Sequence, residues 1–95
     1  MKLCLIIHYD WEQSCFSCTV VDQLFKVLLS ASECYLLRDD EPCKVLVWNK
    51  YDSLGFLEKN EEVKLSSDKS NDGVTIIKSI INLYFKDCEL TSITI

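Results

Sequence analysis

The chain has 95 residues, of which 48% are hydrophobic and 26% charged, with two glycines and one proline. This balance excludes a disordered, collagen-like or linker protein and predicts one small domain over residues 1–95. Fifteen acidic residues against ten basic ones give a net charge of −5. The lysines stand singly among carboxylates, a distribution that disfavours autonomous nucleic-acid binding.

No apolar run is longer than five residues, so we expect no membrane-spanning helix and no membrane partner. We also expect no secretion signal, because the N-terminal residues lack a cationic start followed by an apolar stretch and a small-residue cleavage site. The six cysteines are therefore expected to be reduced thiols that act as small core side chains in an intracellular protein, nuclear or cytoplasmic.

The first twenty residues predict two paired strands. Residues 2–8 are apolar and rich in strand formers, and residues 9–13 form a charged turn. Residues 14–20 then alternate small polar with apolar side chains, which predicts a half-buried strand antiparallel to the first.

The next segment carries an apolar period of about three helical turns. Its members recur at i, i+3, i+4, i+7 and i+8: Val21, Leu24, Phe25, Leu28 and Leu29. This spacing predicts a helix over residues 21–31. A strand also fits part of it, because alternate residues from position 25 onward are apolar.

A hairpin is predicted further along. Residues 34–37 and 44–49 are strand-like, and the charged residues 38–42 between them are typical of a turn. Residues 51–57 are a connection, and residues 62–65 predict a short alternating strand.

The C-terminal third begins with a polar surface loop over residues 66–73, the best candidate for mobility. Residues 74–88 are apolar on one face at helical spacing and predict a helix, although a fully buried strand fits as well. Residues 90–95 predict a final strand. These elements make an α+β domain, mainly antiparallel β, with one or two helices.

Two cysteine patterns deserve a chemical interpretation. Cys15-Phe-Ser-Cys18 has the spacing of a thiol oxidoreductase pair, but Phe-Ser between the thiols is atypical, and two thiols on a strand is the favoured interpretation. Zinc would need Cys4 and His8 beside that pair, yet these two lie about 13 Å apart along an extended strand. We therefore expect no metal, no cofactor and no catalytic activity.

A resemblance lies between residues 34 and 65. Tyr35-Leu-Leu-Arg-Asp-Asp, Lys44-Val-Leu-Val-Trp-Asn and Leu57-Glu-Lys-Asn-Glu-Glu-Val-Lys-Leu resemble strands of OB-fold domains of the replication-protein and telomere-cap families. The resemblance implies a small barrel whose second and third strands face the ligand. On this analogy, the ligand-facing positions are Arg38, Lys44, Trp48 and Tyr51.

A rival resemblance covers the N-terminal third. A hairpin over residues 2–20 followed by a helix over residues 21–31 resembles the order of elements in ubiquitin-like β-grasp folds. The apolar C-terminal segment is then an unexplained addition.

Both resemblances imply a non-catalytic protein–protein interaction module. The high apolar content of so short a chain predicts an obligate protein partner. In the first resemblance, the module is an acidic OB-like subunit of a single-stranded-DNA, telomere or DNA-repair complex, associated with DNA only indirectly and docked by strand addition at the exposed hairpin edge. Three alternatives stay open: direct single-stranded nucleic-acid binding on an aromatic strand face, a ubiquitin-like adaptor, and a thiol oxidoreductase. The candidate binding residues are Arg38, Lys44, Trp48, Tyr51 and Phe56, although Trp48 and Phe56 fit the core equally well.

Overall fold

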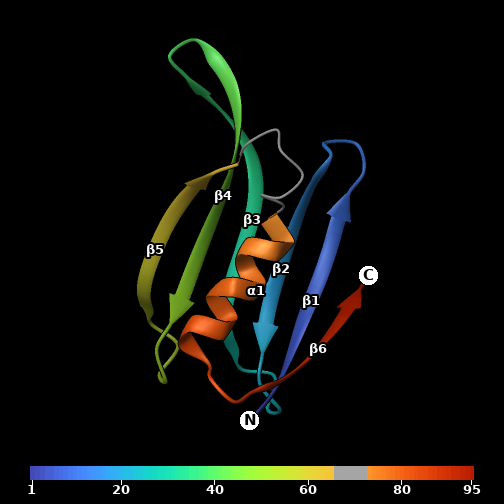
Figure 1. Ribbon diagram of the computed structural model, residues 1–95, viewed down its shortest axis with the longest axis vertical. Helices are drawn as coiled ribbons and strands as arrows, with labels where there is room; N and C mark the ends of the chain where they lie inside the picture. The colour runs from blue at the N-terminus through green and yellow to red at the C-terminus, as the bar shows by residue number, and fades with distance from the viewer. Residues whose placement is uncertain (66–72) are drawn as a thin grey trace.

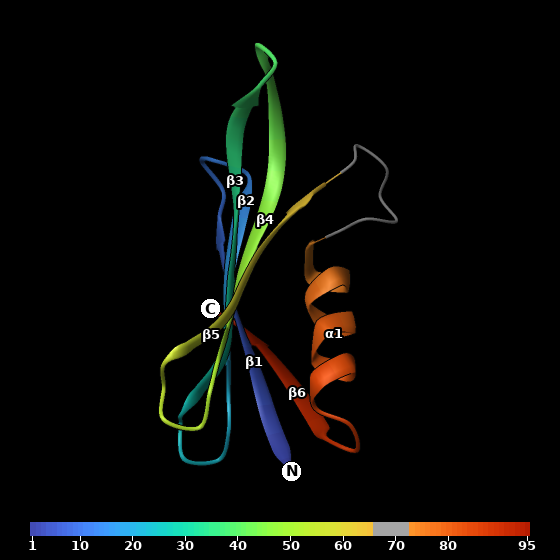
Figure 2. The ribbon, with the colours of Figure 1, turned by 90° about the vertical axis from the view of Figure 1, so that its left-hand side faces the viewer.

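A computed structural model of the protein describes residues 1–65 and 73–95, which form one six-stranded sheet with a helix against one of its faces (Figures 1 and 2). The elements in chain order are β1 (Lys2–Asp10), β2 (Cys15–Val21), β3 (Val27–Arg38), β4 (Glu41–Tyr51), β5 (Leu57–Lys64), α1 (Gly73–Tyr84) and β6 (Glu89–Thr94). The predicted surface loop lies, except for Gly73, outside the described residues.

The strand order is β5-β4-β3-β2-β1-β6. Every neighbouring pair is antiparallel except β1 and β6, which run parallel. The predicted α+β class with mainly antiparallel strands is therefore confirmed. The sheet is open, with β5 at one edge and β6 at the other, and the described strands do not close into a barrel.

Both predicted hairpins are present. β1 pairs with β2 from Cys4 opposite Val21 to Asp10 opposite Cys15. β3 and β4 pair up to Arg38 opposite Glu41, so the turn between them is only two residues long. Asp39 and Asp40 both have positive φ, 50° and 61°, which matches the twist of a tight hairpin and suits short acidic side chains.

The helix predicted over residues 21–31 is wrong. β2 ends at Val21, a turn follows, and β3 begins at Val27. The Asp22 carboxylate stabilises this turn, because its Oδ1 accepts hydrogen bonds from two backbone N–H groups within it. The order of hairpin then helix, on which the ubiquitin-like resemblance rested, is not the order found.

The core lies between the sheet and α1. Ile77 and Ile81 of the helix are wholly buried. They belong to one cluster with sheet residues that are also wholly buried, namely Leu5, Val20, Leu29 and Leu46. Each such side chain contributes about 1.5 to 3 kcal/mol relative to an exposed one. The helical period predicted for residues 74–88 is thus confirmed, with the helix ending at Tyr84.

Gly73 allows α1 to start close to the sheet. A Cβ atom at this position would lie 2.5 Å from Cε1 of the Phe16 ring, a distance at which atoms overlap. The Phe16 ring is only 4% exposed and has little room to move. The absence of a side chain at residue 73 therefore sets the distance between the helix and β2.

The other face of the sheet is left uncovered by the described part of the chain, as Figure 2 shows with α1 on one side only. The β3–β4 hairpin also extends beyond its neighbours: β2 stops pairing with β3 at Ser32, and β5 stops pairing with β4 at Val45. We call the projecting residues 35–43 the hairpin arm (Figure 1).

Candidate interaction surface

The structure places the predicted site residues in several different regions. Trp48 is only 3% exposed and lies in the core, with its ring 6.2 Å from that of Tyr84 on α1. Tyr51 is half-buried, and its hydroxyl group is 2.9 Å from Oγ of Ser30. Trp48 and Tyr51 therefore do not form the exposed aromatic strand face that direct nucleic-acid binding would need.

Arg38 and Lys44 are brought together, on the wall of a hollow beside the hairpin arm that Tyr35 also lines. Both cations have partners within the chain. The Arg38 guanidinium donates a hydrogen bond to Glu62 at 2.6 Å. Nζ of Lys44 donates to the carbonyl oxygen of Ser14 at 2.7 Å and lies 3.5 Å from the Glu33 carboxylate.

Glu33 explains why Lys44 is held at this position. Its side chain is 7% exposed, and its second oxygen accepts a hydrogen bond from the Phe16 backbone N–H at 3.0 Å, just beyond the last β2–β3 pair. Burial alone would lower the pKa of the Lys44 ammonium, but Glu33 and Tyr35 outweigh burial and raise that pKa. Lys44 thus stabilises the start of the hairpin arm by neutralising the nearly buried Glu33 carboxylate.

The strand-addition edge predicted for the hairpin exists only along the arm. β3 has β2 beside it over residues 27–32, and β4 has β5 beside it over residues 45–51, so in the described chain these parts of the hairpin are interior.

The two cysteines of the Cys-x-x-Cys pattern lie on one strand, three residues apart, so their side chains point to opposite faces of the sheet. Burial raises the pKa of Cys15, and it raises the pKa of Cys18 to about 11. A reactive thiol pair needs a lowered pKa instead. All six cysteines are free thiols, and residues 1–65 and 73–95 contain no group of three potential ligands that could hold a metal ion.

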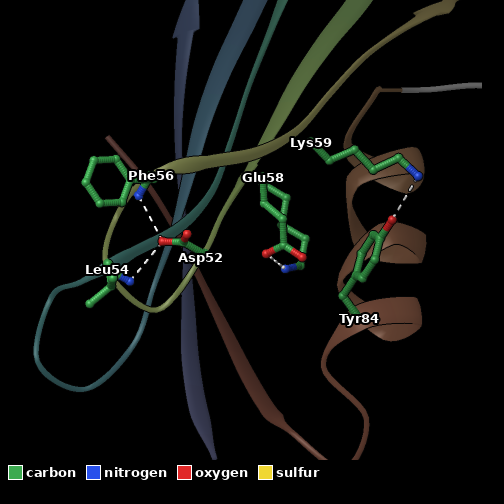
Figure 3. A network of polar contacts seen from close by, with 7 residues as sticks. Asp52, Leu54, Phe56, Glu58, Lys59 and Tyr84 are labelled. Atoms are coloured by element: carbon green, nitrogen blue, oxygen red, sulfur yellow. Dashed lines mark hydrogen bonds and ion pairs between the residues drawn. The ribbon is translucent and has the colours of Figure 1, made fainter.

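Phe56, the remaining predicted site residue, is 67% exposed and belongs to the turn at residues 52–56, between β4 and β5. Asp52 organises this turn through four hydrogen bonds, and Figure 3 shows those that its carboxylate accepts. Its Oδ1 accepts from the N–H groups of Leu54 (2.9 Å) and Phe56 (3.0 Å). Its own N–H donates to the Phe56 carbonyl (2.8 Å), and its carbonyl accepts from the N–H of Gly55 (3.0 Å).

The turn at residues 22–26, between β2 and β3, repeats this arrangement bond for bond. Oδ1 of Asp22 accepts from the N–H groups of Leu24 (2.9 Å) and Lys26 (3.0 Å). The N–H of Asp22 donates to the Lys26 carbonyl (3.1 Å), and its carbonyl accepts from the N–H of Phe25 (3.0 Å). We call residues 22–26 and 52–56 the twin turns.

The fourth residue of each twin turn has a left-handed backbone conformation, with φ of 61° at Phe25 and 89° at Gly55. Glycine adopts this conformation freely, whereas for a bulky residue it costs about 1 to 2 kcal/mol. Phe25 is nevertheless 81% exposed, so packing within the chain does not explain the choice of an aromatic residue there. Strain that is kept at an exposed position is typical of functional sites.

The twin turns lie side by side at one end of the sheet and curl away from α1, toward the uncovered face (Figures 1 and 2). Two strand spacings separate their midpoints, which corresponds to about 10 Å. Each turn exposes a leucine at its third position, with Leu24 at 87% and Leu54 at 79%. The twin turns therefore concentrate four large apolar side chains, Leu24, Phe25, Leu54 and Phe56, at one end of the molecule.

A hollow of about 250 Å³ adjoins the turn at residues 22–26. Phe25 and Val21 line one side of it, Cys4 and Ile6 lie on β1, and Ile93 lies on β6. The walls are mainly apolar, so the surface around the twin turns offers both projecting side chains and a recess.

Of these residues, only Phe56 was identified from the sequence. Leu24 and Phe25 were missed because their segment was assigned to a helix, and Leu54 because it lay in a connection without a motif. The available signal was the repeated order of Asp followed two residues later by Leu, in Asp22-Gln-Leu-Phe-Lys and Asp52-Ser-Leu-Gly-Phe.

Comparisons of the chain with protein-family models, with curated proteins and with solved structures find no match. Within the described residues, α1 is too short to cross a lipid bilayer.

Proposed function

We propose that the protein is a non-catalytic protein–protein interaction module that binds its partner through the twin turns. The observation that carries the proposal is the exposure of Leu24, Phe25, Leu54 and Phe56 on two turns built by the same hydrogen bonds. An apolar side chain that leaves water on binding contributes about 1.5 to 3 kcal/mol, and aromatic side chains are common among the residues that dominate binding energy.

The hydrogen bonds of Asp22 and Asp52 support this role because they hold the turns in one conformation before binding. A rigid loop loses less conformational entropy on association than a flexible one, so more of the contact energy remains as affinity. The strained backbone at Phe25 also supports partner binding, because the exposed aromatic ring adds little to the stability of the fold.

The charges around the twin turns favour a protein over nucleic acid or a lipid surface. Each turn contains an aspartate, the turn at residues 22–26 adds one cation, Lys26, and Lys50 near the end of β4 is paired with Glu58 at 2.8 Å. The chain as a whole carries a charge of −5. Phosphate groups, of DNA or of anionic lipids, are recognised by clusters of free cations instead.

A narrower form of the same proposal places the module in a single-stranded-DNA, telomere or DNA-repair complex. The acidic charge supports contact with another protein of such a complex, with DNA reached only indirectly. The free state of all six thiols is consistent with a reducing nuclear or cytoplasmic location.

The test is quantitative affinity capture from cell extract with the full chain as bait. The variant Leu24→Ser/Leu54→Ser removes an exposed leucine from each twin turn, and Leu83→Ser on α1, where the side chain is 65% exposed, is the matched control. A direct partner should be recovered at least about tenfold less well with the double variant, because one buried leucine is worth about that factor in affinity. Recovery with Leu83→Ser should equal that of the wild type.

All three proteins should have the same circular dichroism spectrum, because the substituted side chains are exposed. The proposal is contradicted if no captured protein depends on the two leucines, or if Leu83→Ser loses the same proteins. Binding of a single-stranded oligonucleotide or of anionic vesicles that depends on the two leucines would favour those ligands instead.

A further inference from the structure

The two edges of the sheet differ in how they are protected. β5 carries charged side chains at five of its eight positions, Glu58, Lys59, Glu61, Glu62 and Lys64. β6 carries one in six, Glu89, and is otherwise built of leucine, threonine, serine and isoleucine. Charged side chains on an edge strand discourage pairing with another chain. The β5 edge is thus protected, and the β6 edge is open to pairing.

The hydrogen bonds of β6 identify which of its backbone groups face outward. The N–H of Glu89 donates to the carbonyl of Met1, and the N–H of Ile95 donates to the carbonyl of Ile7, both at 2.8 Å. Because successive residues of a strand direct their N–H and C=O groups to opposite sides, the even-numbered residues of β6 direct theirs away from β1. These residues are Leu90, Ser92 and Thr94, and no other strand of the described chain lies beside them.

We propose that β6 pairs antiparallel with β6 of a second copy of this chain, about a two-fold axis through Ser92. The three outward-facing residues are spaced symmetrically about Ser92, so each copy meets the other in the same register. Ser92 lies opposite Ser92 of the second copy, and Leu90 lies opposite Thr94. Each of these opposed pairs exchanges two N–H to C=O bonds, and one sheet then runs through both copies.

Charge and side-chain shape favour a second copy as the occupant of this edge. In this register, Glu89 lies opposite Ile95, and the two Glu89 carboxylates are about 20 Å apart, twice the screening length of about 10 Å at moderate salt. On the uncovered face, Thr91 lies opposite Ile93, a pair of β-branched side chains that packs well across antiparallel strands. Self-pairing therefore brings no like charges together, although the whole chain is acidic.

The symmetric arrangement also closes on itself. A two-fold pairing uses the β6 edge of both copies and leaves the charged β5 edges outermost, so the assembly stops at a dimer. The turn at residues 52–56 lies next to β5, at the far edge of the sheet from β6 (Figure 1), and stays accessible.

Amide hydrogen exchange of the full chain, followed by NMR at increasing concentration, tests the register. The amides of Ser92 and Thr94 should exchange at least about tenfold more slowly once the dimer forms. The amides of Thr91 and Ile93, which face β1, should be protected at every concentration. If Ser92 and Thr94 exchange quickly at all concentrations up to the millimolar range, the proposal is overturned.

Sedimentation equilibrium is the second test of the proposal. The wild type should reach twice the monomer mass. Ile93→Lys should dimerise at least about tenfold more weakly, because two ammonium groups are brought close to the two-fold axis. Asn60→Lys on β5 should behave as the wild type. A wild-type chain that stays monomeric, a dimer that survives Ile93→Lys, or a dimer lost only in Asn60→Lys would each contradict pairing through β6.

Discussion

At the scale of one residue, Phe25 is an aromatic residue at a turn position where folding alone would favour glycine or asparagine. The equivalent position of the other turn holds Gly55, which suits a left-handed backbone conformation. The aromatic side chain is exposed and its backbone is strained, so folding would be served at least as well by a smaller residue.

Phe25→Asn should therefore stabilise the fold by about 0.5 to 1 kcal/mol, because asparagine tolerates the left-handed region and little packing is lost. Urea unfolding followed by circular dichroism measures the change. Gly55→Ala is the opposite control and should destabilise the protein by about 1 kcal/mol, since it introduces strain at φ 89°. A loss of more than about 1 kcal/mol in Phe25→Asn would mean that the ring packs within the chain.

Cys18 makes stability depend on pH. Burial raises its pKa to about 11 in the folded chain from an ordinary value of 9.0. Between these values, the folded chain holds the proton that the unfolded chain releases, so the free energy of unfolding should fall as pH rises from 9 to 11. The full effect is about 2 to 3 kcal/mol.

Denaturant unfolding at pH 8, 10 and 11 checks this slope, with Cys18→Ala as the reference. The alanine variant loses packing and is less stable at pH 8, but its stability should change less with pH. Cys15 and Lys44 contribute a further loss at high pH in both proteins, because the pKa of each is also raised in the folded state. Equal slopes for the two proteins would show that Cys18 is not the titrating group.

At the scale of an element, α1 depends on the missing side chain at its first residue. Gly73→Ala should destabilise the fold by about 1 to 3 kcal/mol, although alanine favours helix formation, because its methyl group would overlap the buried Phe16 ring. Thermal unfolding measures this cost. In a Phe16→Leu background, where the ring is absent, Gly73→Ala should destabilise the fold less than it does in the wild type. A stabilising Gly73→Ala would show that α1 can move away from β2.

The elements predicted correctly are those whose signal is local. The first hairpin, α1 and β6 each follow from a periodicity within about ten residues, and the structure confirms all three. The segment after Val21 failed because its apolar residues fit both a helical and an alternating period. The structure follows the alternating period from Val27 onward, after a turn that the Asp22 hydrogen bonds stabilise.

The candidate site was harder to predict because it depends on contacts between distant segments. The sequence around Trp48 fits an exposed strand position and a core position equally well, and the residue is buried because α1 returns over that face some thirty residues later. The twin turns, in turn, are separated by about the same stretch of chain. Only the strand order places them at one end of the sheet.

At the scale of the whole molecule, apolar surface and charge are distributed unevenly. One face of the sheet is covered by α1, the other is uncovered by the described chain, and the exposed leucines and phenylalanines of the twin turns gather at one end of it. The β5 edge carries five charged residues, and the β6 edge carries one, Glu89. This asymmetry supports a molecule with two contact regions, the twin turns for a different protein and the outward edge of β6 for a second copy, which adjoin at the hollow that Phe25 and Ile93 both line.

The most direct measurement of the central claim is an NMR titration of the isotope-labelled chain with the partner protein whose capture depends on Leu24 and Leu54. Binding should shift or broaden the amide signals of residues 22–26 and 52–56 and leave those of α1 unchanged. Shifts confined to the hairpin arm, to α1 or to β6, with the twin turns unaffected, would contradict the assignment of the twin turns as the partner-binding surface.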